Sequence, residues 1–258
     1  MAWNYTTYIL NTNIIQKLYY REIKMKKYSI CGLNVLMEAG KITDRQAEKY
    51  LTANNFEAAD IIVCASQEAI EDYSRQNRTN NDISAYMVEA GIFYRQLLNF
   101  NGVFLHASAV VYDDKAYLFS APSGTGKSTH TSLWLELLGD EAYILNDDKP
   151  AIRVLGNDIF VYGTPFSGKH DISVPNAVKL GGICFISRGD KDKVSLMEKR
   201  EAVFKMYRAS LRKLDEAQLD KELEILQNIV LNVPVYSMEC TPTINSAKIA
   251  VEIMTKGE

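Results

Sequence analysis

The residues with the clearest chemistry lie in one short segment, positions 116–129, which reads AYLFSAPSGTGKST. An apolar run is followed by small residues and then by Gly126, Lys127 and Ser128. This order predicts a strand, a loop and a helix, whose N-terminal amides and partial positive charge attract an anion. In such a loop the lysine reaches the β- and γ-phosphates, and the hydroxyl ligates Mg²⁺. The segment therefore predicts binding of a nucleoside triphosphate such as ATP.

The predicted phosphate-binding residues belong to the loop and the first helical turn: Ser123, Gly124, Thr125, Gly126, Lys127, Ser128 and Thr129. The usual motif has a glycine five positions before its Gly-Lys-Ser/Thr end, and Ala121 stands at that position here. Gly124, inside the loop, relieves the same crowding. The alternative is a glycine-rich turn without a ligand, and it is disfavoured because glycine, lysine and hydroxyl coincide at the start of a helix.

Two adjacent carboxylates, Asp147 and Asp148, follow a short strand predicted at 143–145. Phosphoryl transfer needs a metal ligand and a group that accepts the proton of the nucleophile. Neighbouring side chains of an extended chain point to opposite sides, so one carboxylate would face Mg²⁺ and the other the acceptor as a base. A solvated turn is the alternative. Lys149 and Arg153 are weaker candidates for a phosphate contact.

Two histidines lie near these groups in the sequence. His106 is predicted in the middle of a strand over 102–112, where it is able to bond Asp147 and tune its proton affinity. The alternative is a core histidine that bonds the backbone. His130 follows the phosphate loop in the first helical turn, and we expect it on the helix surface.

The segment 161–171 reads VYGTPFSGKHD and is unusually rich in loop-forming residues. Lys169 and His170 in this loop are predicted to position the acceptor or to neutralise charge in the transition state. The end of a plain hairpin is the alternative. Arg188 follows a strand predicted at 178–187, where a guanidinium would clamp a phosphate or simply lie at the surface.

Composition narrows the function classes. The chain has 258 residues, 47% of them hydrophobic, and a formal net charge of −3, which suits one large domain with or without a smaller attachment. Basic residues are scattered, so no nucleic-acid partner is predicted. The four cysteines have no metal-ligand spacing and are expected as buried free thiols in the cytoplasm. No apolar run reaches the roughly 18 residues of a membrane helix.

The pattern of apolar residues predicts an α/β fold with a mixed sheet. Asp113 and Asp114 join two predicted strands, 102–112 and 115–120, so tightly that the strands must be antiparallel. Further elements are predicted as strands at 28–38, 59–66, 151–162 (a hairpin) and 233–240, and as helices at 83–100, 127–138, 198–212, 215–230 and from Thr243 onward. Gly139 is expected to end the helix at 127–138, and Asp215 to cap the helix at 215–230.

The chain is expected to divide into an N-terminal extension and a core. Residues 1–100 are expected to form a small α/β extension on a core of residues 101–258. Met25 precedes a strand-like run and is a second candidate start, so residues 1–24 are expected to be poorly ordered or untranslated.

Three motifs together resemble HPr kinase/phosphorylase: FLHAS at 104–108, SGTGKS at 123–128 and NDD at 146–148. The loop also looks like that of ATP-dependent phosphoenolpyruvate carboxykinase, whose nucleotide domain is similar to the HPr kinase core. NDDKP at 146–150 with GTPFSGKH at 163–170 is more specifically similar to HPr-kinase-like proteins identified as serine kinases in bacterial genomes. Some of their relatives accompany modified-peptide gene clusters. The resemblance extends over about residues 100–190.

The resemblance implies an HPr kinase/carboxykinase-like P-loop core and roles for individual residues. Lys127 would bind phosphate, Ser128 and Asp148 would serve Mg²⁺, and Asp147 would be the base, assisted by His106. The sequence leaves open which aspartate takes which role. The Glu-x-Arg-Gly signature of HPr kinases is not found after the Asp pair. HPr as acceptor and phosphorylase activity are therefore not implied.

The predicted function is ATP- and Mg²⁺-dependent phosphorylation of a hydroxyl, with a serine of a protein or peptide as acceptor. Three alternatives remain open. The first is a kinase whose acceptor is a small hydroxylated metabolite. The second is a regulatory module that binds nucleotide without turnover. The third is a carboxykinase, although the chain is short for an enzyme of that type. HPr kinases assemble, so a homo-oligomer is also open.

Overall fold

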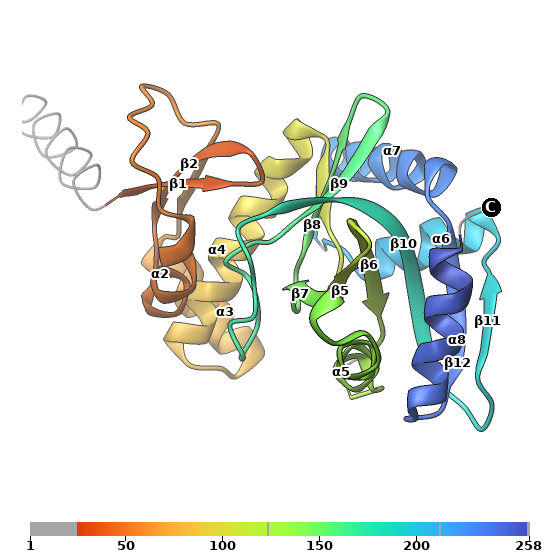
Figure 1. Cartoon of the computed structure of the whole chain (residues 1–258). Coiled ribbons are helices and arrows are strands. Elements are labelled where there is room, and N and C mark those ends of the chain that lie inside the picture. The colour runs from red at the N-terminus through yellow and green to blue at the C-terminus, as the bar shows by residue number, and fades with distance from the viewer. Residues whose placement is uncertain (1–24, 123, 212, 257–258) are drawn as a thin grey trace, which may run out of the picture.

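The computed structural model describes residues 25–122, 124–211 and 213–256 (Figure 1). The predictions for residues 1–24 and for Ser123 lie outside this part of the chain. The elements form two sheets, one of three strands and one of nine, with helices packed against both. Within the described residues, no helix has the length and apolar character needed to cross a bilayer.

The larger sheet is mixed, as predicted. Its strands are β4 (Gly102–Phe104), β5 (Ala107–Tyr112), β6 (Lys115–Ser120), β7 (Ala142–Asn146), β8 (Ala151–Leu155), β9 (Asp158–Tyr162), β10 (Ala177–Arg188), β11 (Lys193–Leu196) and β12 (Val235–Cys240). Their order is β4-β8-β9-β10-β6-β5-β7, and β12 pairs with both β10 and β11. β10 runs parallel to β6 and β12, whereas β5 and β6 are antiparallel across the Asp113-Asp114 turn.

Helices cover both faces of this sheet (Figure 1). α5 (Lys127–Leu138) and α8 (Ile244–Thr255) pack together on one face, and α6 (Lys199–Arg208) and α7 (Glu216–Asn232) pack together on the other. Successive residues of β6 alternate between the two buried clusters: Tyr117 and Phe119 belong to the α5/α8 side, Ala116 and Leu118 to the other. The central strand is therefore buried on both faces.

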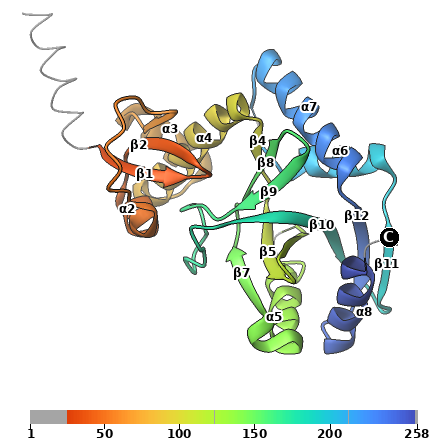
Figure 2. The same ribbon diagram turned by 45° about the horizontal axis from the view of Figure 1, so that its top comes forward.

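The smaller sheet belongs to the N-terminal part. It consists of β1 (Lys26–Ile30), β2 (Leu33–Glu38) and β3 (Ile61–Cys64), with α2 (Lys41–Ala47), α3 (Gln67–Asn77) and α4 (Asn81–Leu97). Short 3₁₀ turns come directly after α2 (Glu48–Tyr50) and α4 (Leu98–Phe100), and another comes after α5 of the larger sheet's region (Gly139–Glu141). α4 contacts β3 of the small sheet and β4 of the large one, and one hydrophobic cluster spans both sheets. Figure 2 shows α4 between the small sheet and β4. The division of the chain at residue 100 stays a prediction.

Three predicted elements have different boundaries in the structure. The strand predicted at 28–38 is a hairpin, because Cys31 and Gly32 turn the chain with φ of 57° and 71°. The strand predicted at 102–112 is two strands, because the chain leaves β8 after Phe104 and joins β6 and β7 from Ala107. The helix predicted at 83–100 begins at Asn81, and the side chain of Asn80 caps it.

Other local predictions are confirmed or extended. α5 has the predicted bounds and ends at Gly139, which has φ of 56°. Asp215 caps α7 through a capping box with Gln218. α2, α3 and β11 were not predicted. His130 is only 2% exposed, so its expected place on the helix surface is wrong.

Candidate functional site

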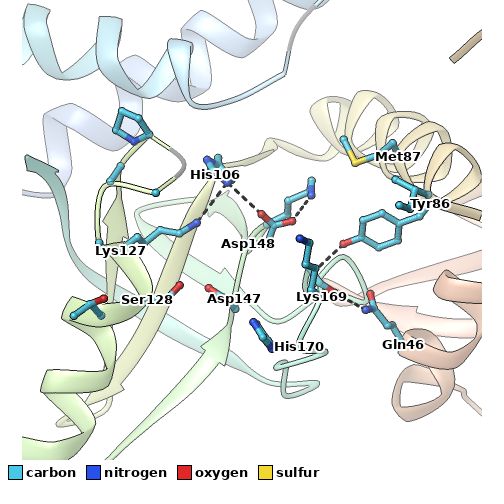
Figure 3. A pocket seen from close by; sticks show the side chains of 18 of the residues that line it. Gln46, Tyr86, Met87, His106, Lys127, Ser128, Asp147, Asp148, Lys169 and His170 are labelled. Carbon is cyan, nitrogen blue, oxygen red and sulfur yellow. Dashed lines mark hydrogen bonds and ion pairs between the residues drawn. The ribbon is translucent and has the colours of Figure 1, made fainter. Parts of the chain in front are cut away.

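The predicted chemical groups line one cleft of about 800 Å³ (Figure 3). One wall is the phosphate loop and the start of α5. The opposite wall comprises the turn of residues 147–149 and the loop of residues 168–170, and helices α2 and α4 close the side. The cleft therefore brings together residues that are distant in the sequence.

The loop that the sequence predicts to bind phosphate turns with two glycines of positive φ, Gly124 and Gly126. β6 leads into it and α5 leaves it at Lys127. Gly126 stands at the N-cap position with φ of 114°, a value that favours glycine. None of the described side chains caps this helix N-terminus. The amides of the first turn are therefore available to an anionic ligand.

Arg188 holds this loop from the end of β10. Its Nε donates to the carbonyl of Thr125 at 3.1 Å, and its Nη2 donates to the carbonyl of Gly124. The guanidinium also lines the cleft. The structure thus directs the Arg188 guanidinium to the loop backbone, whereas the sequence left open a clamp on phosphate and a place at the surface.

Lys127 projects from the loop toward the aspartates (Figure 3). Burial lowers the pKa of Lys127, and the charges of Asp147 and Asp148 oppose that shift. Its Nζ lies 3.5 Å from Nε2 of His106. The ammonium group therefore faces the cleft with no carboxylate hydrogen-bonded to it among the described residues.

His106 lies at the break between β4 and β5, so its predicted position within a strand is wrong. Its backbone N–H donates to Ala209 at 2.7 Å, and its carbonyl accepts from the Ser120 hydroxyl at 2.9 Å. Nε2 lies 3.2 Å from Oδ1 of Asp148, so the histidine contacts Asp148 and not Asp147. A protonated Nε2 donates there and cannot also accept from Lys127. Lys127 thus stays available to an anion.

The aspartate pair diverges because Asp148 has a left-handed backbone, with φ of 75°. Oδ1 of Asp148 meets His106, and Oδ2 accepts from Nζ of Lys149. Burial alone raises the pKa of Asp148, but the His106 hydrogen bond and the Lys149 charge outweigh it and hold that pKa well below its usual range. Asp148 is therefore a fixed, ionised carboxylate.

Asp147 differs from Asp148 in its hydrogen bonding. Its Oδ1 is buried and accepts no hydrogen bond from any described residue. Asp147 and Ser128 both line the cleft (Figure 3). A buried carboxylate oxygen without a partner is costly, so a ligand is expected to satisfy it.

Oδ1 of Asp147 and the hydroxyl oxygen of Ser128 are suited to binding Mg²⁺. No group of three or more His, Cys, Asp or Glu side chains that could hold a metal occurs in the described residues. Mg²⁺ needs fewer protein ligands, because it is usually held by one or two carboxylates, water and substrate phosphates. The free oxygen of Asp147 and the hydroxyl of Ser128 are hard donors of this kind.

The loop that carries Lys169 and His170 is fastened at Gly168. The carbonyl of Gly168 accepts from Nε2 of Gln46 at 2.7 Å, and its N–H donates to the hydroxyl of Tyr86 at 3.0 Å. Burial raises the pKa of Tyr86, which therefore stays protonated. Lys169 and His170 are exposed and line the cleft. The N-terminal helices thus set where these two residues stand.

A buried network fixes the aspartate turn from behind. The hydroxyl of Tyr94 donates to the carbonyl of Lys149 at 2.5 Å and lies 3.0 Å from the hydroxyl of Thr164. The amide N–H of Thr164 donates to Oδ1 of Asn146 at 2.6 Å. Phe166 packs between Tyr94 and other rings. The turn and the loop therefore form one packed unit.

Sequence reasoning missed several of these supporting residues: Gln46, Tyr86, Tyr94 and Thr164. No local pattern marks them, because each acts on a segment far away in the chain. Arg153, a weak phosphate candidate, donates to the carbonyls of Cys31 and Phe100 instead. Lys149, the other weak candidate, is bonded to Asp148.

The fold is α/β with mixed sheets, and its site is a cleft at the mouth of a strand-loop-helix turn. The model of the family described as SynChlorMet cassette protein ScmC matches residues 74–245, and the chain belongs to that family. No curated protein matches the chain.

Solved structures include a distant likeness. The Hpr(Ser) kinase/phosphatase from Coxiella burnetii is similar with 14% sequence identity and a TM-score of 0.35. The similarity covers 59% of this chain and 88% of that one. A likeness of this size does not assign the chain to the HPr kinases, and that resemblance stays a prediction.

Proposed function

We propose that the cleft binds ATP with Mg²⁺ and transfers the γ-phosphoryl group to a hydroxyl, a serine of a protein or peptide. One observation carries the proposal. An uncapped helix N-terminus with Lys127 faces two carboxylates in different states, one fixed by hydrogen bonds and one with a free buried oxygen. Phosphoryl transfer needs these parts in one place.

The nucleotide end of the site uses the loop. The amides of Gly124 and of residues 126–128, together with the Lys127 ammonium, bind the triphosphate, while the Thr125 amide donates to the carbonyl of Pro122. Ser128 and the free oxygen of Asp147 hold Mg²⁺, which neutralises charge on the phosphates when bound. This assignment exchanges the two aspartates relative to the roles that the HPr kinase resemblance implies.

Asp148 then receives the acceptor proton. Its low pKa makes it a weak base, but in a loose transition state the nucleophile loses its proton late, and orientation matters more than basicity. His106 and Lys149 supply that orientation by holding one oxygen each. Lys169 and His170 stand at the cleft and position the acceptor or neutralise charge on the phosphoryl group.

A smaller hollow of about 280 Å³ shares Gly126 and Thr129 with the cleft, and its lining suits a nucleobase. It is lined by loop and helix residues including Thr125 and Leu133, and by Cys240 and Pro242 after β12. Apolar side chains beside a phosphate loop offer a flat base a dry surface. We assign the base to this hollow and the acceptor to the large cleft.

The test uses γ-phosphate-labelled ATP, Mg²⁺ and lysate of the source organism. Asp148→Asn should lower transfer about 10²–10⁴-fold while ATP binding persists, because only the oriented carboxylate is lost. Asp147→Asn should weaken Mg²⁺-dependent ATP binding. Asp140→Asn, at an exposed position away from the cleft, is the matched control and should change neither.

The labelled product decides between the alternatives. A protein or peptide band that needs Asp148 supports the proposal, and its mass begins to identify the acceptor. A labelled small molecule moves the function to metabolite phosphorylation. ATP binding without any aspartate-dependent label contradicts catalysis and favours a nucleotide-binding module.

A further inference from the structure

A second cavity of about 800 Å³ adjoins the cleft. Met87 of α4 and Lys149 beside the aspartates line both. The second cavity continues between α3 and α4, where Tyr73 and Arg95 line it, and reaches Phe104 at the end of β4. A path therefore leads from the reacting groups away from the nucleotide, along the N-terminal helices.

The side of the cleft that faces away from the phosphate loop is apolar at the point where the second cavity begins. Ile42 of α2 and Ile83 and Met87 of α4 line it, and Ile83 is 44% exposed. None of these groups serves a triphosphate. An apolar side chain next to the reacting hydroxyl would bury them.

The charged side chains that line the second cavity are mostly positive. Arg95, Lys149 and Lys213 line it against a single carboxylate, Asp72, which is already paired with Arg75. Lys149 is paired with Asp148. Arg95 forms no ion pair with a described residue. Its guanidinium is thus suited to a carboxylate of a ligand.

We propose that the acceptor is an extended polypeptide that occupies both cavities. Its serine lies at Asp148, an apolar neighbour lies on Ile83 and Met87, and an acidic side chain of the flank faces Arg95. The place of the serine rests on the proposed kinase function, whereas the path of the flank rests on the cavities and their charge. A flank of about six extended residues spans about 20 Å. A small metabolite would leave the second cavity unused.

The test measures binding of fluorescent synthetic peptides to the full chain by anisotropy, with no transfer required. Two peptides of about fifteen residues share a central Ser-Leu pair and carry either glutamates or lysines in both flanks. The glutamate peptide should bind about tenfold tighter. Arg95→Gln should weaken the preference, since Lys213 remains in the cavity, and Arg95→Glu should abolish or reverse it. Arg200→Glu, an exposed arginine on α6 outside both cavities, is the charge-matched control.

The possible outcomes separate the two proposals. Equal binding of both peptides, no binding, or a preference that Arg95→Glu leaves unchanged overturns the peptide path, whatever ATP does. Binding with the expected preference but without label transfer from ATP supports the path and contradicts the kinase. Far-UV circular dichroism checks that each variant is folded, and Arg95→Gln keeps the test valid if charge reversal disturbs the fold.

Discussion

The described residues of the phosphate-loop wall, 121–122 and 124–129, come from one short stretch of the chain, whereas the opposite wall of the cleft is assembled from distant segments. In the first wall the strand, the loop and the helix follow one another, and Arg188 is the main outside support. In the second, Gln46 reaches Gly168 across 122 positions of sequence. The first wall is local, and the second depends on tertiary packing.

The two walls should therefore respond differently to remote substitutions. A change behind the local wall should affect nucleotide binding first, because the proposed phosphate ligands, the loop amides and Lys127, lie in that wall. A change behind the assembled wall should affect transfer first, because it moves Asp148 and the Gly168 loop. Each prediction below sharpens or breaks this distinction.

The largest expected effect comes from Phe166→Ala. Phe166 is fully buried, and its ring centroid lies 5.5–5.8 Å from those of Tyr86, Phe93 and Tyr94. Its loss should lower the free energy of unfolding by about 3–5 kcal/mol. Urea unfolding measures this, and in the folded fraction transfer should fall more than ATP affinity.

Phe119→Ala is the matched comparison. Phe119 is equally buried but packs on His130 and Trp134 behind the phosphate loop. It should destabilise the chain by a similar amount and reduce ATP affinity more than Phe166→Ala does. If both variants show the same ratio of lost affinity to lost transfer, the distinction between the walls fails.

The next effect is a pH dependence that arises at the local wall. Burial lowers the pKa of His130 to about 4, and its Nε2 accepts from the indole N–H of Trp134 at 3.2 Å. The unfolded chain takes up this proton near pH 6.5 and the folded chain only near pH 4. The contribution of His130 to the free energy of unfolding is therefore constant above about pH 6.5. It falls by about 3 kcal/mol between pH 6.5 and pH 4, and it does not change further below pH 4.

His130→Gln isolates this dependence. Burial raises the pKa of both Glu89 and Glu222, which makes the folded state more stable as pH falls and so opposes the histidine. Both carboxyls are present in wild type and variant, so they cancel in the difference. Denaturant unfolding between pH 7 and pH 4 should show the wild type losing stability relative to the variant. A constant difference would contradict a buried neutral His130.

Gly168→Ala tests the assembled wall at its closest approach to Asp148. Gly168 has φ of +71°, and an added Cβ would lie 3.0 Å from the Cβ of Asp148. The left-handed backbone alone costs about 1–2 kcal/mol for alanine. Transfer should fall further than this cost explains, with ATP affinity unchanged.

Gly156→Ala is the control for backbone strain. Gly156 has φ of +62° in the β8–β9 turn, and nothing lies within 4 Å of an added Cβ. It should lose comparable stability, measured by urea unfolding, and keep full transfer. Equal transfer by the two variants would remove Gly168 from the site.

The same contrast explains how far the sequence could lead. The strand, turn and helix at 115–138 follow from local patterns, and so do the caps at Asp215 and Gly139. The contact of His106 with Asp148 could not be predicted, because it depends on a strand break and on Ala209, which holds the His106 amide. Nor could Gln46 or Tyr86, whose roles exist only once the N-terminal helices pack on the loop.

The smallest effect tests the support that Arg188 gives to the local wall from the end of β10. Arg188→Ala removes two hydrogen bonds from a charged donor to the carbonyls of Gly124 and Thr125. Because Arg188 is largely exposed, we expect about 1 kcal/mol, or roughly a fivefold weaker ATP affinity, and unchanged transfer from bound ATP. Titration with ATP gives the affinity, single-turnover labelling gives the transfer rate, and Arg200→Ala is the exposed control. A loss of transfer with normal affinity would place Arg188 on the reacting phosphate instead, and the local wall would then share the catalytic task of the assembled one.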